Sequence, residues 1–338
     1  MRVCEFALAK VHVERLPTNL AYMPRITQPR KITSLRLRDG QLYHSEKPDQ
    51  VAVEEPLDIR LNGKQLSLTM RTPGNDVELV HGFLHAEGFI RSREDVAQAR
   101  YCDGAVVEDE SGFAQNTYNV MDVTTRGIQI QPIITRQFTQ SSACGVCGKT
   151  SIDAVETKGR FKLNHDFKVD AATLFKAVNG LTDDQRVFSK TGGVHAAALA
   201  DKDGNLVVER EDVGRHNAVD KVIGWALQND LLPLNEHFLV VSSRASFEIV
   251  QKAYMAGIPL LACVSAPSSL ALDTAERVGM TICGFTRVMN SGKSERGGRG
   301  LGRNAAKSRR NPAGEPVENA RSNIYTWPER IDYSASIS

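Results

Sequence analysis

The 338-residue sequence has few cysteines, few aromatic residues and no long apolar run. Six cysteines in a chain of this length do not make a disulfide framework, so we expect thiols in a reducing compartment. No segment approaches the roughly 18 apolar residues that a membrane-spanning helix needs. Arginines interrupt residues 1–31, which leaves no stretch of the roughly 7–15 apolar residues found in a secretory signal. These absences predict a cytoplasmic protein with no membrane partner.

The net charge is also small, at +2, but it is unevenly distributed along the chain. Residues 287–310 hold eight Lys or Arg and one acidic residue, which gives +7 there and leaves −5 for the rest of the chain. A near-neutral body of this kind is not expected to coat nucleic acid. Residues 288–320 are rich in Gly, Arg, Ser and Pro, so the sequence predicts a disordered basic insert with little to bury.

The pattern of apolar residues divides the chain into a β-rich part and an α/β part. From residue 34, apolar and polar residues alternate as in strands, whereas from residue 170 short apolar strands alternate with helices. We therefore expect the fold class α/β, with a parallel or mixed sheet flanked by helices and a smaller β-rich N-terminal part. The predicted organisation is a loose extension at 1–33, a β-rich part at 34–140, a cysteine loop at 141–150, an α/β domain at 151–287, the insert at 288–320, and a C-terminal strand and tail at 321–338.

Glycine marks several expected turns and helix ends. The pairs Asp39-Gly40, Asn62-Gly63 and Asp203-Gly204 predict hairpin turns between strands. Residues 76–88 have apolar residues at helical spacing, and DAATLFKAVNG predicts a helix that closes at Gly180. These positions provide a local test of the predicted organisation.

Cys144 and Cys147 are the only two cysteines close together in the sequence, in the loop CGVCG. Two thiols three residues apart can bind a metal, cycle as a disulfide or carry sulfur as a persulfide, and each use needs a thiolate. Backbone N–H groups at a glycine-rich helix start, together with Lys149, favour the thiolate. A zinc ribbon would need a second CxxC, which the chain lacks. Alternatively, the two cysteines could be small buried residues with no chemical role.

A zinc deaminase is a further alternative. His85-Ala86-Glu87 spells H-x-E and a CxxC follows, which is similar to the signature of zinc nucleobase deaminases. However, Ala143 rather than proline precedes Cys144, and the end of a helix explains His85 and Glu87 equally well.

Two glycine-containing segments predict an anion site. Gly193 allows close backbone approach, and His195 could contact a bound anion or move a proton. Arg215 and His216 stand where a helix begins, so free N–H groups, a guanidinium and an imidazole together suit a phosphate or pyrophosphate. Each segment could also be a simple turn or a solvated helix start.

The loops after two apolar strands add to this expected site. Ser243 and Arg244 follow the strand HFLVV, and Ser268 follows PLLACVS, which are positions where open α/β sheets bind ligands. Each serine could instead only cap a helix. Cys263 and Cys283 lie inside apolar strands, so we expect both in the core.

Over about residues 34–331, the chain resembles the formate dehydrogenase accessory sulfurtransferase family, FdhD. The resemblance rests on segments that occur in the family's order: CGVCG, TGGVHAAAL, EDVGRHNAVDK, SSRASFEIVQKA, VSAPSSLAL, and GFTR followed by NIYTWPERI. It implies a fold similar to that of cytidine deaminases, without their zinc chemistry, and a homodimer.

The resemblance also implies a function. Members accept sulfur from a cysteine desulfurase as a persulfide on the CxxC loop. They deliver it to the molybdenum of bis-molybdopterin guanine dinucleotide, which formate dehydrogenase needs for activity. Cys144 matches the persulfide cysteine and Cys147 matches its partner.

The family's cofactor-binding stretch begins at a phenylalanine near the C-terminus. Phe285, Thr286 and Arg287 match its start, the basic insert then interrupts the pattern, and Ala320-Arg321 resumes it with alanine in place of the usual glycine. The implied cofactor-binding residues are Phe285, Thr286, Arg287, Val288, Met289, Asn290 and Arg321.

Two other functions stay open at this point. A chaperone could hold the cofactor and dock it into the dehydrogenase without any chemistry, although it would have no use for the two thiols. A zinc-dependent nucleobase deaminase would contain a metal, which none of the sulfur chemistry requires.

Overall fold

The computed structural model describes residues 25–102, 106–108, 114–116, 119–127, 159, 161–288 and 319–333. The cysteine loop at 141–150 lies outside these residues, as do Met289 and Asn290 and nearly all of the insert. Within the described part of the chain, no helix is both long and apolar enough to span a membrane.

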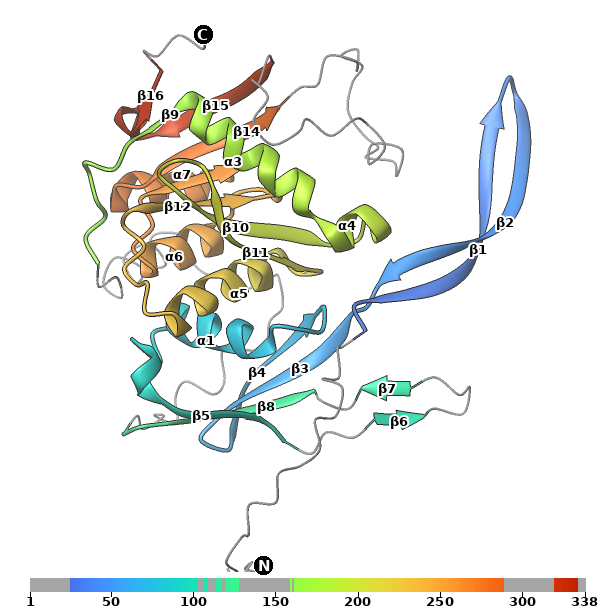
Figure 1. Ribbon diagram of the computed structural model, residues 1–338, viewed down its shortest axis with the longest axis horizontal. Coiled ribbons are helices and arrows are strands. Elements are labelled where there is room, and N and C mark those ends of the chain that lie inside the picture. The colour runs from blue at the N-terminus through green and yellow to red at the C-terminus, as the bar shows by residue number, and fades with distance from the viewer. Residues whose placement is uncertain are drawn as a thin grey trace, which may run out of the picture.

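A six-stranded mixed sheet forms the centre of the α/β part, with strand order β11-β10-β12-β13-β14-β15 (Figure 1). Its central strands β12 (His237–Val241), β13 (Leu260–Cys263) and β14 (Thr281–Val288) run parallel, as their short apolar sequences predicted. Antiparallel strands complete the sheet: β10 (His195–Asp201), β11 (Leu206–Asp212) and β15 (Ala320–Thr326).

Helices cover both faces of this sheet. On one face lie α5 (Arg215–Gln228), α6 (Phe247–Met255) and α7 (Ser269–Val278), and on the other lies α3 (Ala171–Asp184), which is followed by the short α4 (Arg186–Thr191). The sheet is therefore buried on both sides, which is why its middle strands are apolar without alternation.

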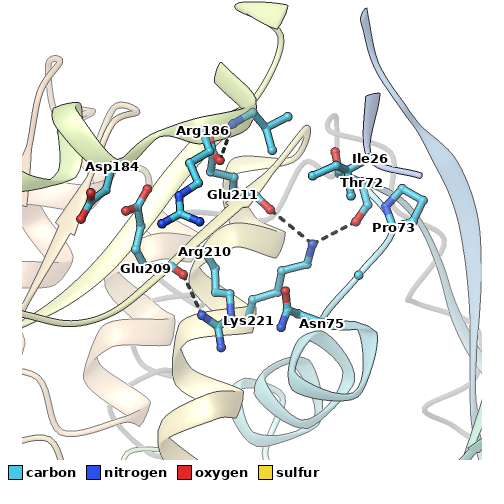
Figure 2. Close-up of a pocket in the computed structure, with 12 residues that line it drawn as sticks. Ile26, Thr72, Pro73, Asn75, Asp184, Arg186, Glu209, Arg210, Glu211 and Lys221 are labelled. Carbon is cyan, nitrogen blue, oxygen red and sulfur yellow. Dashed lines mark hydrogen bonds between the residues drawn. The ribbon is translucent and has the colours of Figure 1, made fainter. Parts of the chain in front are cut away.

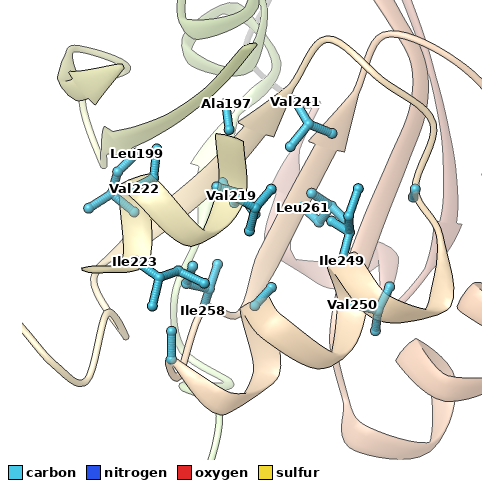
Figure 3. Packing of buried hydrophobic residues seen from close by; sticks show 14 of the residues in the cluster. Ala197, Leu199, Val219, Val222, Ile223, Val241, Ile249, Val250, Ile258 and Leu261 are labelled. Carbon is cyan, nitrogen blue, oxygen red and sulfur yellow. The ribbon is translucent and has the colours of Figure 1, made fainter. Parts of the chain in front are cut away.

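The larger of the two cores in this part lies between α5, α6 and the sheet (Figure 3). Val219, Val222 and Ile223 of α5 belong to the same buried cluster as Ala197 and Leu199 of β10. Close packing of branched side chains against the sheet holds α5 at a set position, and the first turn of α5 carries two of the predicted site residues.

A second, four-stranded sheet forms the β-rich part, with order β4-β3-β8-β5. It consists of β3 (Glu55–Leu61), β4 (Lys64–Arg71), β5 (Val96–Tyr101) and β8 (Val120–Thr125), and α1 (Asp76–Ala86) packs on one face. Helix α1 also packs against α5, so it lies between the small sheet and the α/β part.

The remaining elements are short or project from the body. Strands β1 (Thr27–Arg38) and β2 (Gln41–Ala52) form a two-stranded ribbon that points away from both sheets (Figure 1). The short elements are η1 (Arg93–Asp95), β6 (Val106–Glu108), β7 (Ala114–Asn116), β9 (Val169–Asp170), η4 (Pro328–Arg330) and β16 (Ile331–Asp332).

The structure confirms most of the expected turns and corrects two boundaries. Asp39-Gly40 and Asn62-Gly63 have positive φ angles in tight hairpins, as the sequence predicted. Residues 27–33, expected to belong to a loose extension, form the first half of β1 because β2 pairs with them. Gly180 does not end its helix: α3 continues to Asp184, and a Cβ at Gly180 would lie 3.3 Å from the flexible end of Leu206.

Two glycines allow α1 and α5 to touch backbone to backbone. A Cβ atom on Gly82 would lie 1.9 Å from the carbonyl oxygen of Asp220, and one on Gly224 would lie 1.8 Å from that of Glu78. Real side-chain atoms cannot approach backbone so closely. The junction between the two parts of the protein therefore requires glycine at both positions.

We expect Gly224→Ala to destabilise the protein by about 3 kcal/mol, because the added methyl group must push two packed helices apart. Gly180→Ala is the matched control, since its methyl group meets only the flexible end of Leu206 and alanine favours a helix by up to about 1 kcal/mol. Denaturant unfolding of both variants measures the difference. Equal stability of the two would contradict the packing argument.

Candidate functional site

The topology of the large sheet brings the predicted anion-binding segments to one edge. Strands β12, β13 and β14 end there, and antiparallel pairing places the start of β10, the end of β11 and the start of β15 at the same edge. Six strands at about 4.8 Å spacing give an edge about 24 Å long. The predicted residues on it are His195, Arg215, His216, Ser243, Arg244, Ser268, Phe285, Thr286, Arg287, Val288 and Arg321.

Positive and titratable groups cluster at one end of this edge. His195 begins β10, Arg215 and His216 begin α5, and Arg244 follows β12. Burial and the charge of Arg244 lower the pKa of Arg215. The Arg215 Nε atom is buried and has no hydrogen-bond partner among the described residues. A buried, unpaired guanidinium nitrogen beside a second arginine is suited to bind an anion.

The two histidines at this end differ in their partners. His216 Nε2 lies 2.6 Å from Glu248 Oε2 and 3.2 Å from Ser246 Oγ, which orients its ring. Burial lowers the pKa of His216, although Glu248 opposes the shift. Burial and the nearby charges of Arg215 and His216 lower the pKa of His195 as well. Burial therefore favours the neutral form of both imidazoles.

A second pair of arginines stands at the far end of the edge. Arg287 of β14 pairs in register with Arg321 of β15, and burial together with the charge of Arg321 lowers the pKa of Arg287. The Arg287 Nε atom is also buried without a hydrogen-bond partner in the described chain. The edge thus carries cationic groups at both ends.

Several predicted residues have structural roles at the same edge. Thr286 is fully buried, and its hydroxyl group bonds the Cys283 carbonyl and lies 2.8 Å from Ser322 Oγ. Ser268 Oγ accepts a hydrogen bond from the Ala271 amide at 3.4 Å and so caps α7.

Other predicted residues shape the backbone around the site. Ser243 is buried, and its hydroxyl donates to the Arg244 carbonyl. Phe285 has a positive φ of 53° in a bulge of β14, and its amide bonds the Ser265 carbonyl at 3.1 Å. Gly193 is exposed, and a Cβ atom there would meet Ala52 of the ribbon. Val288 is half-buried at the end of β14.

A buried charge network supports the start of α5. Lys221 Nζ lies 2.7 Å from Asp212 Oδ2 and donates to the Thr72 carbonyl at 3.0 Å. Asp212 accepts from the amides of Thr72 and Gly214, so it joins the β-rich part to the residue before Arg215. Sequence reasoning missed Asp212 and Lys221, although both lie within EDVGRHNAVDK, because their burial was not visible.

A separate pocket of about 420 Å³ lies where the β-rich part meets β11, α3 and α4 (Figure 2). Asp184, Glu209 and Glu211 line it together with Arg186. Burial and the charges of Glu211 and Asp184 raise the pKa of Glu209 to about 8. Glu211 accepts hydrogen bonds from two amides at the start of α4. Arg186, Arg210 and Lys221 line the same pocket, so its charges are mixed, whereas the strand edge offers buried arginine nitrogens without partners among the described residues and is the better match to a polyanion.

The cysteines inside the sheet are unsuited to sulfur chemistry. Cys263 and Cys283 are fully buried, which confirms their predicted place in the core. Burial raises the pKa of Cys263 to about 11 and that of Cys283 to about 12, so both remain thiols at neutral pH. Cys102 is partly exposed at the end of β5. Cys144 and Cys147 lie outside the described residues.

The H-x-E segment occupies a helix end. The ring of His85 is buried, and its Nε2 lies 3.0 Å from the Met255 carbonyl, to which it must donate. Glu87 is the residue that follows α1. Among the residues that the structure describes, no group of three His, Cys, Asp or Glu side chains is arranged to hold a metal. The zinc deaminase alternative therefore has no support from this segment.

Comparison with known proteins now identifies the family. The sequence profile of the FdhD/NarQ family matches residues 52–291. The chain belongs to the FdhD/NarQ family. A protein named "Sulfur carrier protein FdhD" from Streptomyces coelicolor is 51% identical over 269 residues, which cover 78% of this chain and 92% of that relative. A relative of the same name from Mycobacterium tuberculosis is 52% identical over 244 residues, with coverage of 71% and 88%.

A solved structure supports the fold of this family member. A protein from Desulfotalea psychrophila, assigned as a formate dehydrogenase accessory protein, matches with a TM-score of 0.60 at 23% identity. The match covers 90% of this chain and 99% of that one. The mixed sheet with flanking helices and the β-rich N-terminal part are thus confirmed as the predicted fold class.

We expect pyrophosphate to bind more tightly as the pH falls from about 7.5 to about 5.5, because a bound anion raises the low pKa of His195 and binding takes up a proton. The His195→Gln variant should show a smaller increase in affinity over the same pH range. The ligand's own protonation is common to both proteins, so their difference isolates the imidazole. Calorimetry at both pH values provides the measurement, and an identical pH dependence would exclude His195 from the site.

Proposed function

We propose that this chain is the sulfur carrier that formate dehydrogenase requires. It accepts sulfur from a cysteine desulfurase as a persulfide on Cys144 and delivers it to the molybdenum of bis-molybdopterin guanine dinucleotide. The observation that carries the proposal is the match of about 50% identity, over roughly nine-tenths of their length, to relatives named sulfur carrier proteins.

The loading step exchanges one sulfur–sulfur bond for another. The Cys144 thiolate attacks the outer sulfur of the desulfurase persulfide, a new S–S bond forms on Cys144, and the desulfurase cysteine leaves as a thiolate. Attack of Cys147 on the inner sulfur of Cys144 would then release sulfide to the metal and leave a disulfide. A thiol reductant must open this disulfide before the next cycle.

The cationic edge supports a nucleotide-bearing cargo. The cofactor carries two pyrophosphate groups, and the edge offers Arg215 and Arg287 with buried Nε atoms that lack partners among the described residues. Arg244 and Arg321 stand beside them. We infer that the nucleotide portions lie along this edge. The molybdenum centre is substrate here, and the proposal needs no resident metal or zinc.

A chaperone without chemistry is the rival function. It would use the same edge but would have no need for Cys144 and Cys147. The raised pKa values of the buried cysteines leave the CxxC loop as the better source of a reactive thiolate. The sulfurtransferase is therefore the function that we favour.

The proposal includes partners and a location. The donor is a cysteine desulfurase and the client is a formate dehydrogenase, and the carrier itself works in the cytoplasm, where thiols stay reduced. We also propose that the carrier is a homodimer.

We expect Cys144→Ala to abolish sulfur loading and activation of the client, because it removes the accepting thiolate. Cys147→Ala should still load sulfur on Cys144 but fail in delivery. Mass spectrometry after incubation with desulfurase and cysteine detects the added sulfur atom, and a dehydrogenase assay measures delivery.

Cys102→Ala is the control for these two variants, since its thiol is partly exposed but lies outside the loop. It should load and deliver sulfur normally. Normal loading of Cys144→Ala with none on Cys147→Ala would reverse the two roles. Equal loading of both variants through another cysteine would remove the CxxC mechanism.

Guanosine diphosphate should bind the edge as a fragment of the cargo. Arg244→Ala would lose a charge-assisted hydrogen bond of roughly 1.5–3 kcal/mol, which corresponds to about a 10- to 150-fold weaker affinity. The control Arg126→Ala removes an exposed arginine just after β8 and should bind as the wild type does. Calorimetry that gives equal affinities for the wild type and Arg244→Ala would exclude Arg244 from the site.

A further inference from the structure

The ribbon formed by β1 and β2 is unusual in how little it buries. Each strand has 12 residues, and most of them are exposed. Among the described elements, the main contact of the ribbon with the body lies near its base, where Ala52 approaches Gly193 and β2 meets α4. A two-stranded hairpin alone in water is marginally stable at best. A ribbon of this length therefore needs a surface to pack against.

The two faces of the ribbon differ in chemistry. Directly opposed residues share a face, so Leu37 and Leu42 lie side by side with Leu35 next to them. These three leucines, which we call the leucine face, are 72%, 66% and 64% exposed respectively. The opposite face carries Arg36 and Tyr43 at a matched position. Such alternation is typical of a strand pair with one buried face and one solvated face.

A second apolar patch lies on the small sheet. Leu68 and Met70 point away from α1 on β4, which is an edge strand of the described sheet, and are 49% and 46% exposed. The ribbon of the same chain points away from β4 and the rest of the small sheet (Figure 1). Neither apolar surface can therefore cover the other within one copy.

We propose that the ribbon is a dimerisation arm whose leucine face packs on Leu68 and Met70 of a second copy of this chain, reciprocally about a two-fold axis. The inference rests on the homodimer in the proposed function and is independent of its sulfur chemistry. Such an isologous arrangement covers both apolar surfaces of both copies at once.

The area of the ribbon fits a stable dimer. A 12-residue strand is about 40 Å long and a strand pair about 10 Å wide, so one face covers about 400 Å². Two reciprocal contacts that used the whole face, counted on both sides, would remove about 1,600 Å² from water, so the upper limit for this arm is the size of a standard stable interface.

Permanent exposure also favours a copy of the chain over a client protein. The three exposed leucines of the ribbon form a site of unwanted association unless they are covered throughout the life of the protein. A dehydrogenase client is present only during delivery, whereas a second copy is always available.

The test compares two triple variants of the full chain by analytical ultracentrifugation. Leu35→Ser, Leu37→Ser and Leu42→Ser remove the leucine face, and we expect a dimer dissociation constant at least about 100-fold higher. The matched control places Arg36→Ser, Arg38→Ser and Tyr43→Ser on the opposite face and should remain dimeric. Unchanged circular dichroism and thermal unfolding of the body verify that both fold.

A mixing experiment tests the receiving patch. The double variant Leu68→Ser, Met70→Ser should also be monomeric at concentrations where the wild type is a dimer. Mixed with the leucine-face variant, it retains one intact contact per pair, so the mixture should dimerise more tightly than either variant alone. A mixture that stays as monomeric as its components would overturn the assignment of this patch.

The remaining outcomes separate this inference from the proposed function. A leucine-face variant that dimerises like the wild type would overturn the arm while leaving a homodimer through another surface. A monomeric wild type would overturn both the arm and the homodimer, but not sulfur loading on Cys144. Loss of client activation with an unchanged dimer would assign the ribbon to the dehydrogenase and overturn the inference.

Discussion

The contact between α1 and α5 is the constraint on which the site depends. Gly82 and Gly224 let the two helix backbones touch, which seats the β-rich part directly on the helix that begins with Arg215. The buried ion pair of Lys221 and Asp212 also stabilises that junction. Removing either residue would leave an unpaired charge in the interior. The anion-binding end of the strand edge is thus built on an interface between two parts of the chain.

The strand edge and the pocket beside α4 differ in their charged groups. The strand edge presents Arg215 and Arg287 with Nε atoms that lack partners among the described residues, whereas the pocket combines acidic residues such as Glu209 and Asp184 with cationic ones such as Arg186. Burial disfavours the charged form of both kinds of group, since it lowers the pKa of the arginines and raises the pKa of Glu209. The strand edge is therefore the surface that offers unpaired cationic donors to a polyanionic cargo.

Local sequence patterns predicted which helices and strands form better than they predicted where these begin and end. The apolar strands β12, β13 and β14 followed from short apolar runs, and Asp39-Gly40 followed from the backbone that a tight hairpin needs. Gly180 was misjudged because a glycine inside a helix looks the same in sequence as one that ends a helix. Residues 27–33 were misjudged because their strand exists only through pairing with β2.

The sequence by itself determined the α/β class, the types of residue at the strand ends and the family resemblance, because these depend on local periodicity and on motifs read in order. Only the tertiary structure decided which of those residues meet. Antiparallel pairing carried His195 to the edge where Arg244 lies, and helix packing buried Asp212 and Lys221 beneath it. It also engaged the Thr286 and Ser268 hydroxyls in structural bonds and left the ribbon leucines uncovered. Burial and the pairing of distant segments are properties of the whole chain, so no local pattern contains them.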